Sequence, residues 1–333
     1  MAILRAPVLD VGRPAHDLLT RSRRWKVIAR FRRSVYCRDG GGNIVCLGGI
    51  SIGRGPLNVR CVLPFPSDWR TFGLDVGAVV EVDGHLLRLG RRIRLYLDRA
   101  ETWDPPRAQG LSNVPPARLK ALLDAAAHQA PDAGLGSVFR LPVVDVVTGI
   151  APAASSGGVM AAAMPAIAPL ARWLEDSLVT RGPRVLPPPM DVTGLIGLGP
   201  GLTPSGDDFL GGLMIGLRTM NRIDLADRLA RLVLPEARQA TSAISYAHLA
   251  CAARGLGSEV LHQTLAALTA WEPIEVGPYL ESIGRMGATS GWDTLSGTLL
   301  PLRMYLNART PVLPVRGCPP GLQRLRGEIR AHP

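Results

Sequence analysis

Lysine is nearly absent from this sequence: Lys26 and Lys120 are the only lysines among its 38 basic residues. Aromatic residues are also scarce, at 5%, although the net charge is +11. A strongly basic chain suggests nucleic acid as a partner. Here, however, the arginines of residues 21–33 and 88–99 alternate with apolar residues, as on the solvent face of strands. Few aromatic side chains lie among them to stack on bases, so we expect no nucleic-acid partner.

Cysteine is also sparse, and its five positions form no C-x-x-C pair. The odd number and the spacing argue against a disulfide framework or a zinc ribbon. Free cysteines are typical of a reducing cytosol. Arg5 and Asp10 stand where the apolar core of a signal peptide would lie. We therefore expect a cytoplasmic protein.

Long hydrophobic runs are missing. The longest, residues 157–171, ends at Arg172 and is shorter than the roughly 20 residues that a membrane span needs. We expect it to form a buried helix, and we expect no membrane partner.

Turn signals in the N-terminal third predict short β-strands. At 333 residues the chain has room for two domains, since a domain takes roughly 100–200 residues. Glycine turns at residues 39–42 and at Asp83-Gly84 separate alternating apolar segments, as in hairpins. Expected strands are 25–31, 34–37, 43–47, 58–63, 79–82, 85–89 and 93–97. Such strands predict a small β-barrel or sandwich-like domain over residues 1–108.

The remainder indicates a mainly helical domain over residues 116–309, so the fold class is α+β. Apolar residues at helical spacing and proline or serine starts predict its helices. Expected helices are 116–129, 157–179, 205–220, 225–234, 241–254, 258–270 and one from about 290 to 306. The proline- and arginine-rich tail, 310–333, is expected to be mobile.

Two glycine-rich segments share one pattern. The first, at residues 197–212, reads GLGPGLTPSGDDFLGG, and the second, at 287–297, reads GATSGWDTLSG. Aligned, they give S-G-x-D-x-L-x-G, in which Ser205 corresponds to Ser290 and Asp208 to Asp293. We interpret them as two pseudo-repeated loop–helix motifs that face one cleft.

Such loops resemble phosphate cradles. Glycine lets backbone N–H groups approach an anion, and a helix N-terminus adds about half a positive charge. Thr203 is placed as an N-cap, with Pro204 at the first helical position. No lysine follows, as it would in a Walker loop. The predicted substrate- and phosphate-binding residues of the two loops are Gly199, Gly201, Thr203, Ser205, Gly206, Thr289, Ser290 and Gly291.

The aspartates permit a second interpretation. Asp207, Asp208 and Asp293 would repel a bare anion, but together they would suit Mg²⁺ or hold the N–H groups of a polar substrate. We predict all three as catalytic residues and as candidate magnesium ligands. The plainer alternative is that aspartate in a first helical turn stabilises the helix by roughly 0.3–1 kcal/mol.

Residues outside the two loops are also candidates. Ser245 and His248 are three apart and share a helix face, and Glu259 follows. A Ser–His–Glu set is conceivable, although a packed helix face explains the same pattern; His248 is the best histidine for acid–base work. Arg54, between strands, is suited to clamp a carboxylate or phosphate; a plain surface turn is the alternative.

At these residues the sequence resembles the AllH family, whose chains are subunits associated with oxamate carbamoyltransferase. The resemblance rests on GLGPGLTPSGDDFLGG, TSAIS and GATSGWDTLSG, with looser support from GRGPLN at residues 53–58 and from Trp103. It implies a role in purine (allantoin) breakdown, where oxalurate and phosphate give oxamate and carbamoyl phosphate. It also implies sister subunits, one of them similar to an acyl-CoA synthetase.

The residues fit such a reaction. Backbone N–H groups of the loops would bind phosphate and polarise the carbonyl; Arg54 or Arg285 would hold a carboxylate; Asp208 and Asp293 would hold the ureido N–H groups or magnesium.

One alternative is a magnesium-dependent hydrolase that activates water. Another is a non-catalytic subunit that organises the complex through the arginines of its β domain.

Overall fold

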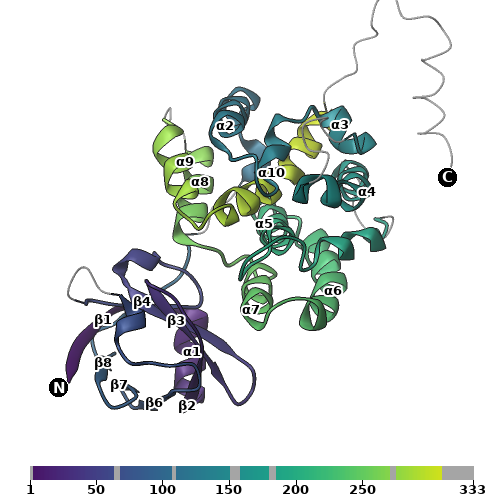
Figure 1. Cartoon of the computed structure of the whole chain (residues 1–333). Helices are drawn as coiled ribbons and strands as arrows, with labels where there is room; N and C mark the ends of the chain where they lie inside the picture. Colours follow the sequence, from purple (N-terminus) through teal and green to yellow (C-terminus); the bar gives the residue numbers. More distant parts are fainter. Residues whose placement is uncertain are drawn as a thin grey trace, which may run out of the picture.

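Strands come first along the chain and helices follow, so the protein is α+β. The computed structural model describes residues 3–63, 68–106, 110–150, 158–179, 185–270 and 275–309. The β domain lies at one end of the molecule, and the helices pack together at the other (Figure 1).

The β domain contains one short helix, α1 (Arg13–Arg21), and nine strands in its described part. The strands are β1 (Leu4–Gly12), β2 (Arg24–Arg30), β3 (Ser34–Asp39), β4 (Ile44–Gly49), β5 (Asn58–Cys61), β6 (Val79–Asp83), β7 (Leu86–Leu89), β8 (Ile93–Tyr96) and β9 (Glu101–Trp103).

The strands close into a barrel. In the described chain the order is β5-β4-β3-β2-β6-β7-β8-β1-β9, and β1 also pairs with β5, which completes a ring that leaves β9 outside. Buried and more exposed residues alternate along the first part of β1 and of β2. Buried residues such as Val8, Trp25 and Leu87 fill the interior of the barrel. Closure removes the free edges that an open sheet would expose.

The sequence predicted seven of these strands and missed the rest. The Asp83-Gly84 hairpin joins β6 and β7 as expected. β1 and β9 were not predicted, and part of the basic segment expected to be a strand instead ends α1 at Arg21. β1 closes the barrel because it pairs with β5 and β8, and it also pairs with β9; all three strands are distant from it in sequence.

Nine helices form the described part of the second domain. They are α2 (Pro116–Gln129), α3 (Val143–Thr148), α4 (Val159–Val179), α5 (Ser205–Thr219), α6 (Ile223–Ala240), α7 (Ala243–Ala252), α8 (Glu259–Thr269), α9 (Gly277–Gly284) and α10 (Ser290–Arg309). The helix starts at 116, 205 and 290 are confirmed; α3 and α9 were not predicted. The expected mobile tail lies outside the described residues.

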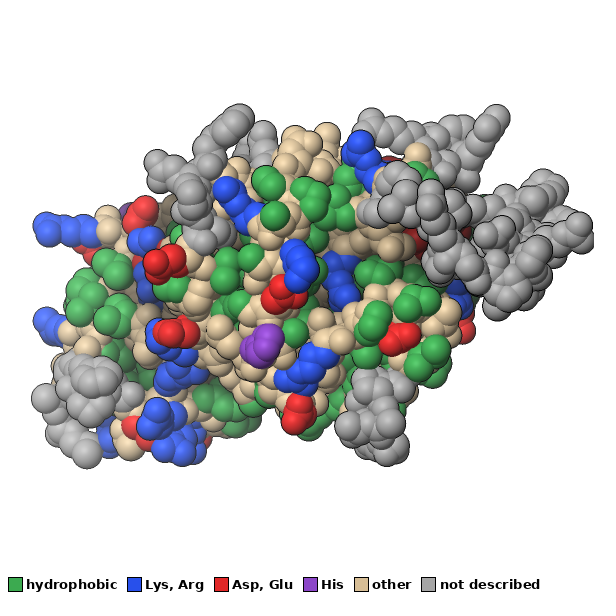
Figure 2. Space-filling view, turned by 90° about the horizontal axis from the view of Figure 1, so that it is seen from above, with side chains coloured by type: hydrophobic (Ala, Val, Ile, Leu, Met, Phe, Trp, Pro, Cys, Tyr) green, Lys and Arg blue, Asp and Glu red, His purple; other side chains and the backbone are tan. Residues whose placement is uncertain are grey.

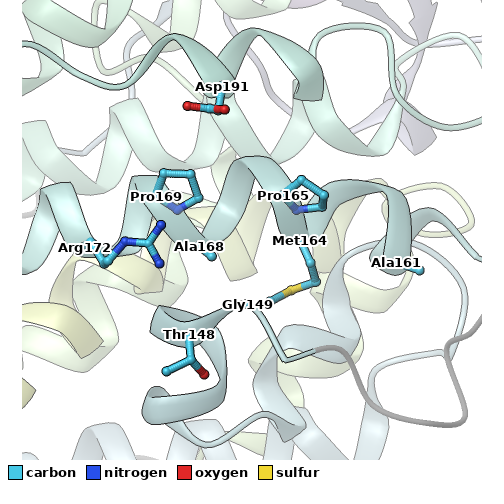
Figure 3. Close-up of a pocket in the computed structure, with 9 residues that line it drawn as sticks. All are labelled: Thr148, Gly149, Ala161, Met164, Pro165, Ala168, Pro169, Arg172 and Asp191. Carbon is cyan, nitrogen blue, oxygen red and sulfur yellow. The ribbon is translucent and has the colours of Figure 1, made fainter.

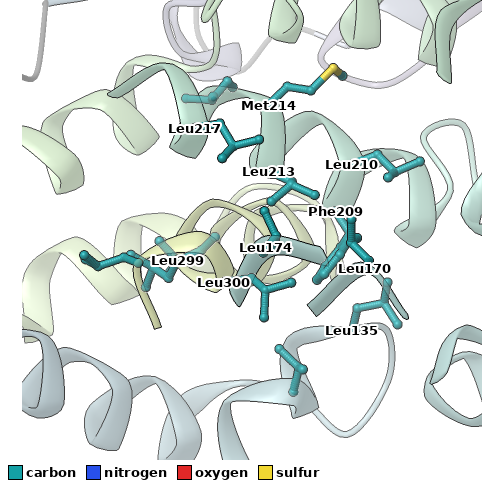
Figure 4. Packing of buried hydrophobic residues seen from close by; sticks show 14 of the residues in the cluster. Leu135, Leu170, Leu174, Phe209, Leu210, Leu213, Met214, Leu217, Leu299 and Leu300 are labelled. Carbon is teal, nitrogen blue, oxygen red and sulfur yellow. The ribbon is translucent and has the colours of Figure 1, made fainter. Parts of the chain in front are cut away.

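The core of this domain forms around α5. Leucine side chains of α4, α5 and α10 meet there, with Leu174, Leu213 and Leu300 among them (Figure 4). α5 and α10 approach closely because glycines face backbone. A Cβ at Gly212 would lie 1.9 Å from the Thr294 carbonyl oxygen, and one at Gly297 would lie 2.0 Å from that of Phe209.

Residues 159–171 of the apolar run are part of α4, which is buried along most of its length, as predicted. No helix in the described ranges is long and apolar enough to cross a membrane. Cys37, Cys46, Cys61 and Cys251 are free thiols, whereas Cys318 lies outside the described residues. On the face in Figure 2, basic side chains are interspersed with acidic and apolar ones.

Candidate functional site

A cleft of about 870 Å³ lies where the barrel meets the helical domain. The β2–β3 turn, β3, β4 and the loop after β4 supply the barrel wall, and the starts of α5 and α10 with α7 and the end of α9 supply the other. Nine predicted site residues line it: Arg54, Gly201, Thr203, Asp207, Asp208, Ser245, His248, Thr289 and Ser290. The sequence prediction therefore converges on one place.

A second cavity, of about 560 Å³, lies along α4 (Figure 3). Met164, Pro165, Pro169 and Arg172 of α4 line this cavity, and Asp191 lines it from a different segment. None of the predicted site residues lines it. The interdomain cleft is therefore the candidate functional site.

The two glycine loops contact each other at the base of the cleft. α5 begins at Ser205 and α10 at Ser290, which are corresponding residues of the two motifs. Thr203 Oγ1 and Ser290 Oγ are 3.1 Å apart. The prediction that Thr203 caps α5 is wrong: Pro204 occupies the N-cap position, with no side-chain cap. The Thr203 hydroxyl is directed instead to the second loop.

Asp208 and Asp293 lie in the first turns of α5 and α10. Asp293 is fully buried, and its Oδ1 accepts a hydrogen bond of 2.6 Å from the backbone N–H of Leu135. Within the described residues, Oδ2 of Asp208 and Oδ2 of Asp293 are buried without a hydrogen-bond partner. Unpaired buried acceptors are costly, so these two oxygens are unusual in a folded protein.

Burial raises the pKa of both carboxyl groups above the ordinary 3.8. For Asp208 the neighbouring charge of Asp293 raises the pKa further, while the hydroxyls of Ser290 and Thr203 oppose the shift. For Asp293 the opposing groups are the Leu135 N–H and the hydroxyls of Ser205 and Thr289. Two like charges this close favour a pair that holds a proton.

Asp207 behaves differently although it is adjacent to Asp208. Its Oδ1 accepts from the Gly197 N–H at 2.9 Å, and its Oδ2 accepts from the hydroxyls of Thr241 and Ser245, the latter at 2.6 Å. Asp207 therefore ties the first glycine loop to the start of α7. Among the described residues, no group of three or more His, Cys, Asp or Glu could hold a metal ion. The predicted three-carboxylate magnesium site of Asp207, Asp208 and Asp293 is not formed.

Two of the glycine N–H groups predicted to bind phosphate, those of Gly206 and Gly291, donate hydrogen bonds within their own loops. The Gly206 N–H donates to the Leu198 carbonyl at 2.9 Å, and the Gly291 N–H donates to that of Met286 at 3.1 Å. Both glycines are required sterically, since a Cβ would lie 1.9 Å and 2.0 Å from backbone oxygens. Gly199 and Gly201 have φ of +111° and +104°, a region that favours glycine. Gly199 and Gly201 therefore shape the turn before α5.

The conceivable Ser–His–Glu set is not assembled. The Ser245 hydroxyl donates to Asp207, and Glu259 pairs with Arg54 at 3.3 Å. His248 lines the cleft. Burial lowers its pKa to about 4, so its ring is neutral near pH 7. His248 keeps a place in the site as a neutral donor or acceptor.

Arg54 lies on the rim of the cleft, but its guanidinium is occupied. It contacts Asp10 at 3.2 Å, Glu101 at 3.3 Å and Glu259 at 3.3 Å. Arg60 also binds the buried Asp10, at 2.8 Å. Arg54 thus joins the barrel to α8, and a substrate anion would have to displace one of these partners.

Sequence reasoning missed the barrel's contribution. Ser34, Tyr36 and Cys46 line the cleft, and Tyr36 is the register partner of Cys46 across β3 and β4. Burial, Cys46 and Asp208 raise the pKa of Tyr36 well above 10.0, and burial raises that of Cys46 to about 11. Both side chains are therefore neutral near pH 7. No motif signals them, because pairing across β3 and β4 and domain packing bring them to the site.

One of the comparisons with known proteins gives a match. The family model described as oxamate carbamoyltransferase subunit AllH matches residues 195–302, a segment that contains both glycine loops. This segment is similar to the AllH family. The matched segment does not extend to residues 53–58 or Trp103, where the sequence showed a looser resemblance. Comparisons of the chain with curated proteins and with solved structures find no match.

Proposed function

We propose that this chain is a subunit of a carbamoyltransferase that converts oxalurate and phosphate to oxamate and carbamoyl phosphate in purine nitrogen breakdown. The observation that carries the proposal is the pair of buried carboxylate oxygens without donors, Asp208 Oδ2 and Asp293 Oδ2. A ureido group presents several N–H donors on a flat frame. Asp208 lines the cleft, whereas Asp293 is fully buried and does not line it, so Asp208 is the residue to meet the substrate.

The raised pKa of Asp208 suits proton transfer. A phosphate oxygen forms the bond to the carbamoyl carbon, and the bond from that carbon to the oxamate nitrogen breaks. The leaving nitrogen takes a proton from neutral Asp208, which regains one from the attacking hydrogen phosphate. Asp293 keeps the pair partly protonated, and His248 offers a neutral ring to the same space.

We infer that the segments beginning at Ser205 and Ser290 are two copies of one loop–helix unit. Each helix begins at the matching serine. The glycine contacts support the inference because they are reciprocal: Gly212 faces Thr294 and Gly297 faces Phe209, which are matching pairs of positions. Such symmetry would place the two aspartates in equivalent first turns of facing helices.

Carbamoyl phosphate formation from oxalurate and phosphate tests the proposal. The assay uses the chain alone and with its sister subunits, with magnesium and with a chelator. We expect activity in the full set and a loss of roughly 10²–10⁴-fold on Asp208→Asn. Asp191→Asn is the matched control, since Asp191 is exposed and outside the cleft.

The other outcomes identify the alternatives. Activity of the full set that survives Asp208→Asn would make this chain a scaffold. Turnover by the isolated chain that depends on magnesium would indicate a hydrolase, because Mg²⁺ takes one or two carboxylates and otherwise water or substrate oxygens. No activity in any mixture would refute the substrate.

A further inference from the structure

The two helix ends at the cleft offer little positive charge to a second anion. The N-termini of α5 and α10 already face the buried pair Asp208 and Asp293, and the N–H groups of Gly206 and Gly291 are used within their own loops. A helix N-terminus next to a carboxylate has little attraction left for a second anion. Basic side chains with unpaired charge would therefore hold an anionic group in this cleft better than the helix ends would.

The tip of the β2–β3 hairpin supplies that charge. The Phe31 N–H donates to the Ser34 carbonyl at 2.8 Å, which leaves Arg32 and Arg33 between them at the turn. The Trp69 N–H fixes the turn by donating to the Arg32 carbonyl at 2.9 Å. Both arginines line the cleft and are exposed.

The two guanidinium groups are available. Within the described ranges, neither side chain makes a hydrogen bond or an ion pair, although Arg32, after Arg70, contributes to lowering the pKa of Asp68 to about 2. Other arginines at the cleft are engaged: Arg54 with three carboxylates, and Arg285 with Glu281 at 3.1 Å. Adjacent guanidinium groups suit a phosphate or carboxylate, which they can bind through paired donors.

We propose that Arg32 and Arg33 form an oxyanion-binding site on the barrel wall of the cleft. A small ligand would place its phosphate or carboxylate on these arginines and its N–H groups on Asp208, which lines the opposite wall. The barrel is thus part of the site rather than only a docking module. The identity of the ligand rests on the proposed function, but the anion site does not.

Calorimetric titration of the full chain with inorganic phosphate, and separately with oxamate, tests the site at constant ionic strength. Arg32→Gln and Arg33→Gln should each weaken binding about tenfold or more, because each removes a charge-assisted contact. Arg38→Gln is the matched control: Arg38 is exposed on β3 of the same hairpin but does not line the cleft. Competition between the two anions shows whether the arginines hold phosphate, a carboxylate or either.

Equal affinities in the wild type and both variants would overturn the site. So would an equal loss in Arg38→Gln, or the absence of binding at millimolar anion. Arginine-dependent binding in a chain that never supports carbamoyl transfer would refute the proposed function alone. Activity together with arginine-independent binding would refute the anion site alone.

Discussion

Asp208 lies beside Ser290, the first residue of α10, while Asp293 lies beside Ser205, the first residue of α5. Each carboxyl group is thus placed at the N-terminus of the other helix. This exchange explains how two acidic groups are tolerated in a buried position, since helix N-termini favour negative charge. It also leaves one oxygen of each without a donor within the described chain.

Asp208→Asn should stabilise the protein at neutral and mildly alkaline pH. Because burial raises the pKa of Asp208 above 3.8, its contribution to stability is fully present below 3.8 and is lost as the pH rises through the raised value. An amide carries no charge, so the variant lacks this loss. Thermal unfolding of both proteins over a pH series measures the difference.

The pH dependence of stability must be compared between the wild type and the variant, because other groups also change the stability of each protein with pH. His248 and His262 have pKa values lowered to about 4 by burial, so stability present above 6.5 is lost as the pH falls through about 4. This opposite trend is common to wild type and variant and cancels in the difference. Parallel curves for the two proteins would contradict the raised pKa of Asp208.

Asp207→Asn should destabilise the protein, whereas Asp208→Asn should stabilise it. Asp207 accepts hydrogen bonds from Gly197, Thr241 and Ser245, and an amide nitrogen cannot accept. We expect a destabilisation of about 1–3 kcal/mol, because a buried donor loses its acceptor. Urea unfolding at neutral pH measures it, and a variant as stable as the wild type would show that these bonds do not hold the loop.

Gly212→Ala should disrupt the packing of α5 on α10. Its Cβ would lie 1.9 Å from the Thr294 carbonyl, so the helices must separate, at a cost of about 1–3 kcal/mol or more. Gly277→Ala is the control, since nothing lies within 4 Å of its Cβ and alanine restricts the unfolded chain. Chemical denaturation should separate the two variants; similar midpoints would be incompatible with the close approach of the helices.

Arg54→Met should weaken the junction of barrel and helices. Arg54 joins Asp10 and Glu101 of the barrel to Glu259 of α8, and Asp10 is buried. We expect a loss of about 1–3 kcal/mol. Arg13→Met removes only an exposed pair with Asp104 and should cost at most about 1 kcal/mol. Equal melting temperatures for the two variants would rule out the bridging role.

Local chemistry in the sequence determined the elements and the neighbourhood of the site. The Asp83-Gly84 dipeptide predicted the hairpin of β6 and β7, and Pro116 predicted the start of α2. The S-G-x-D pattern indicated where α5 and α10 begin. These signals need only neighbouring residues, because turn and cap preferences are local. The resemblance to the AllH family rested on the same motifs.

Only the tertiary structure decided what each residue does. Asp207 and Asp208 are adjacent in sequence, but successive helical residues point about 100° apart. Asp207 ties a loop to α7, whereas Asp208 keeps an oxygen without a hydrogen-bond partner among the described residues. Barrel closure through β1 and β5, and the packing of the barrel on the helices, bring Tyr36, Arg32 and Arg33 to the site. No spacing in the sequence encodes those contacts, because they join residues that only the folded chain brings together.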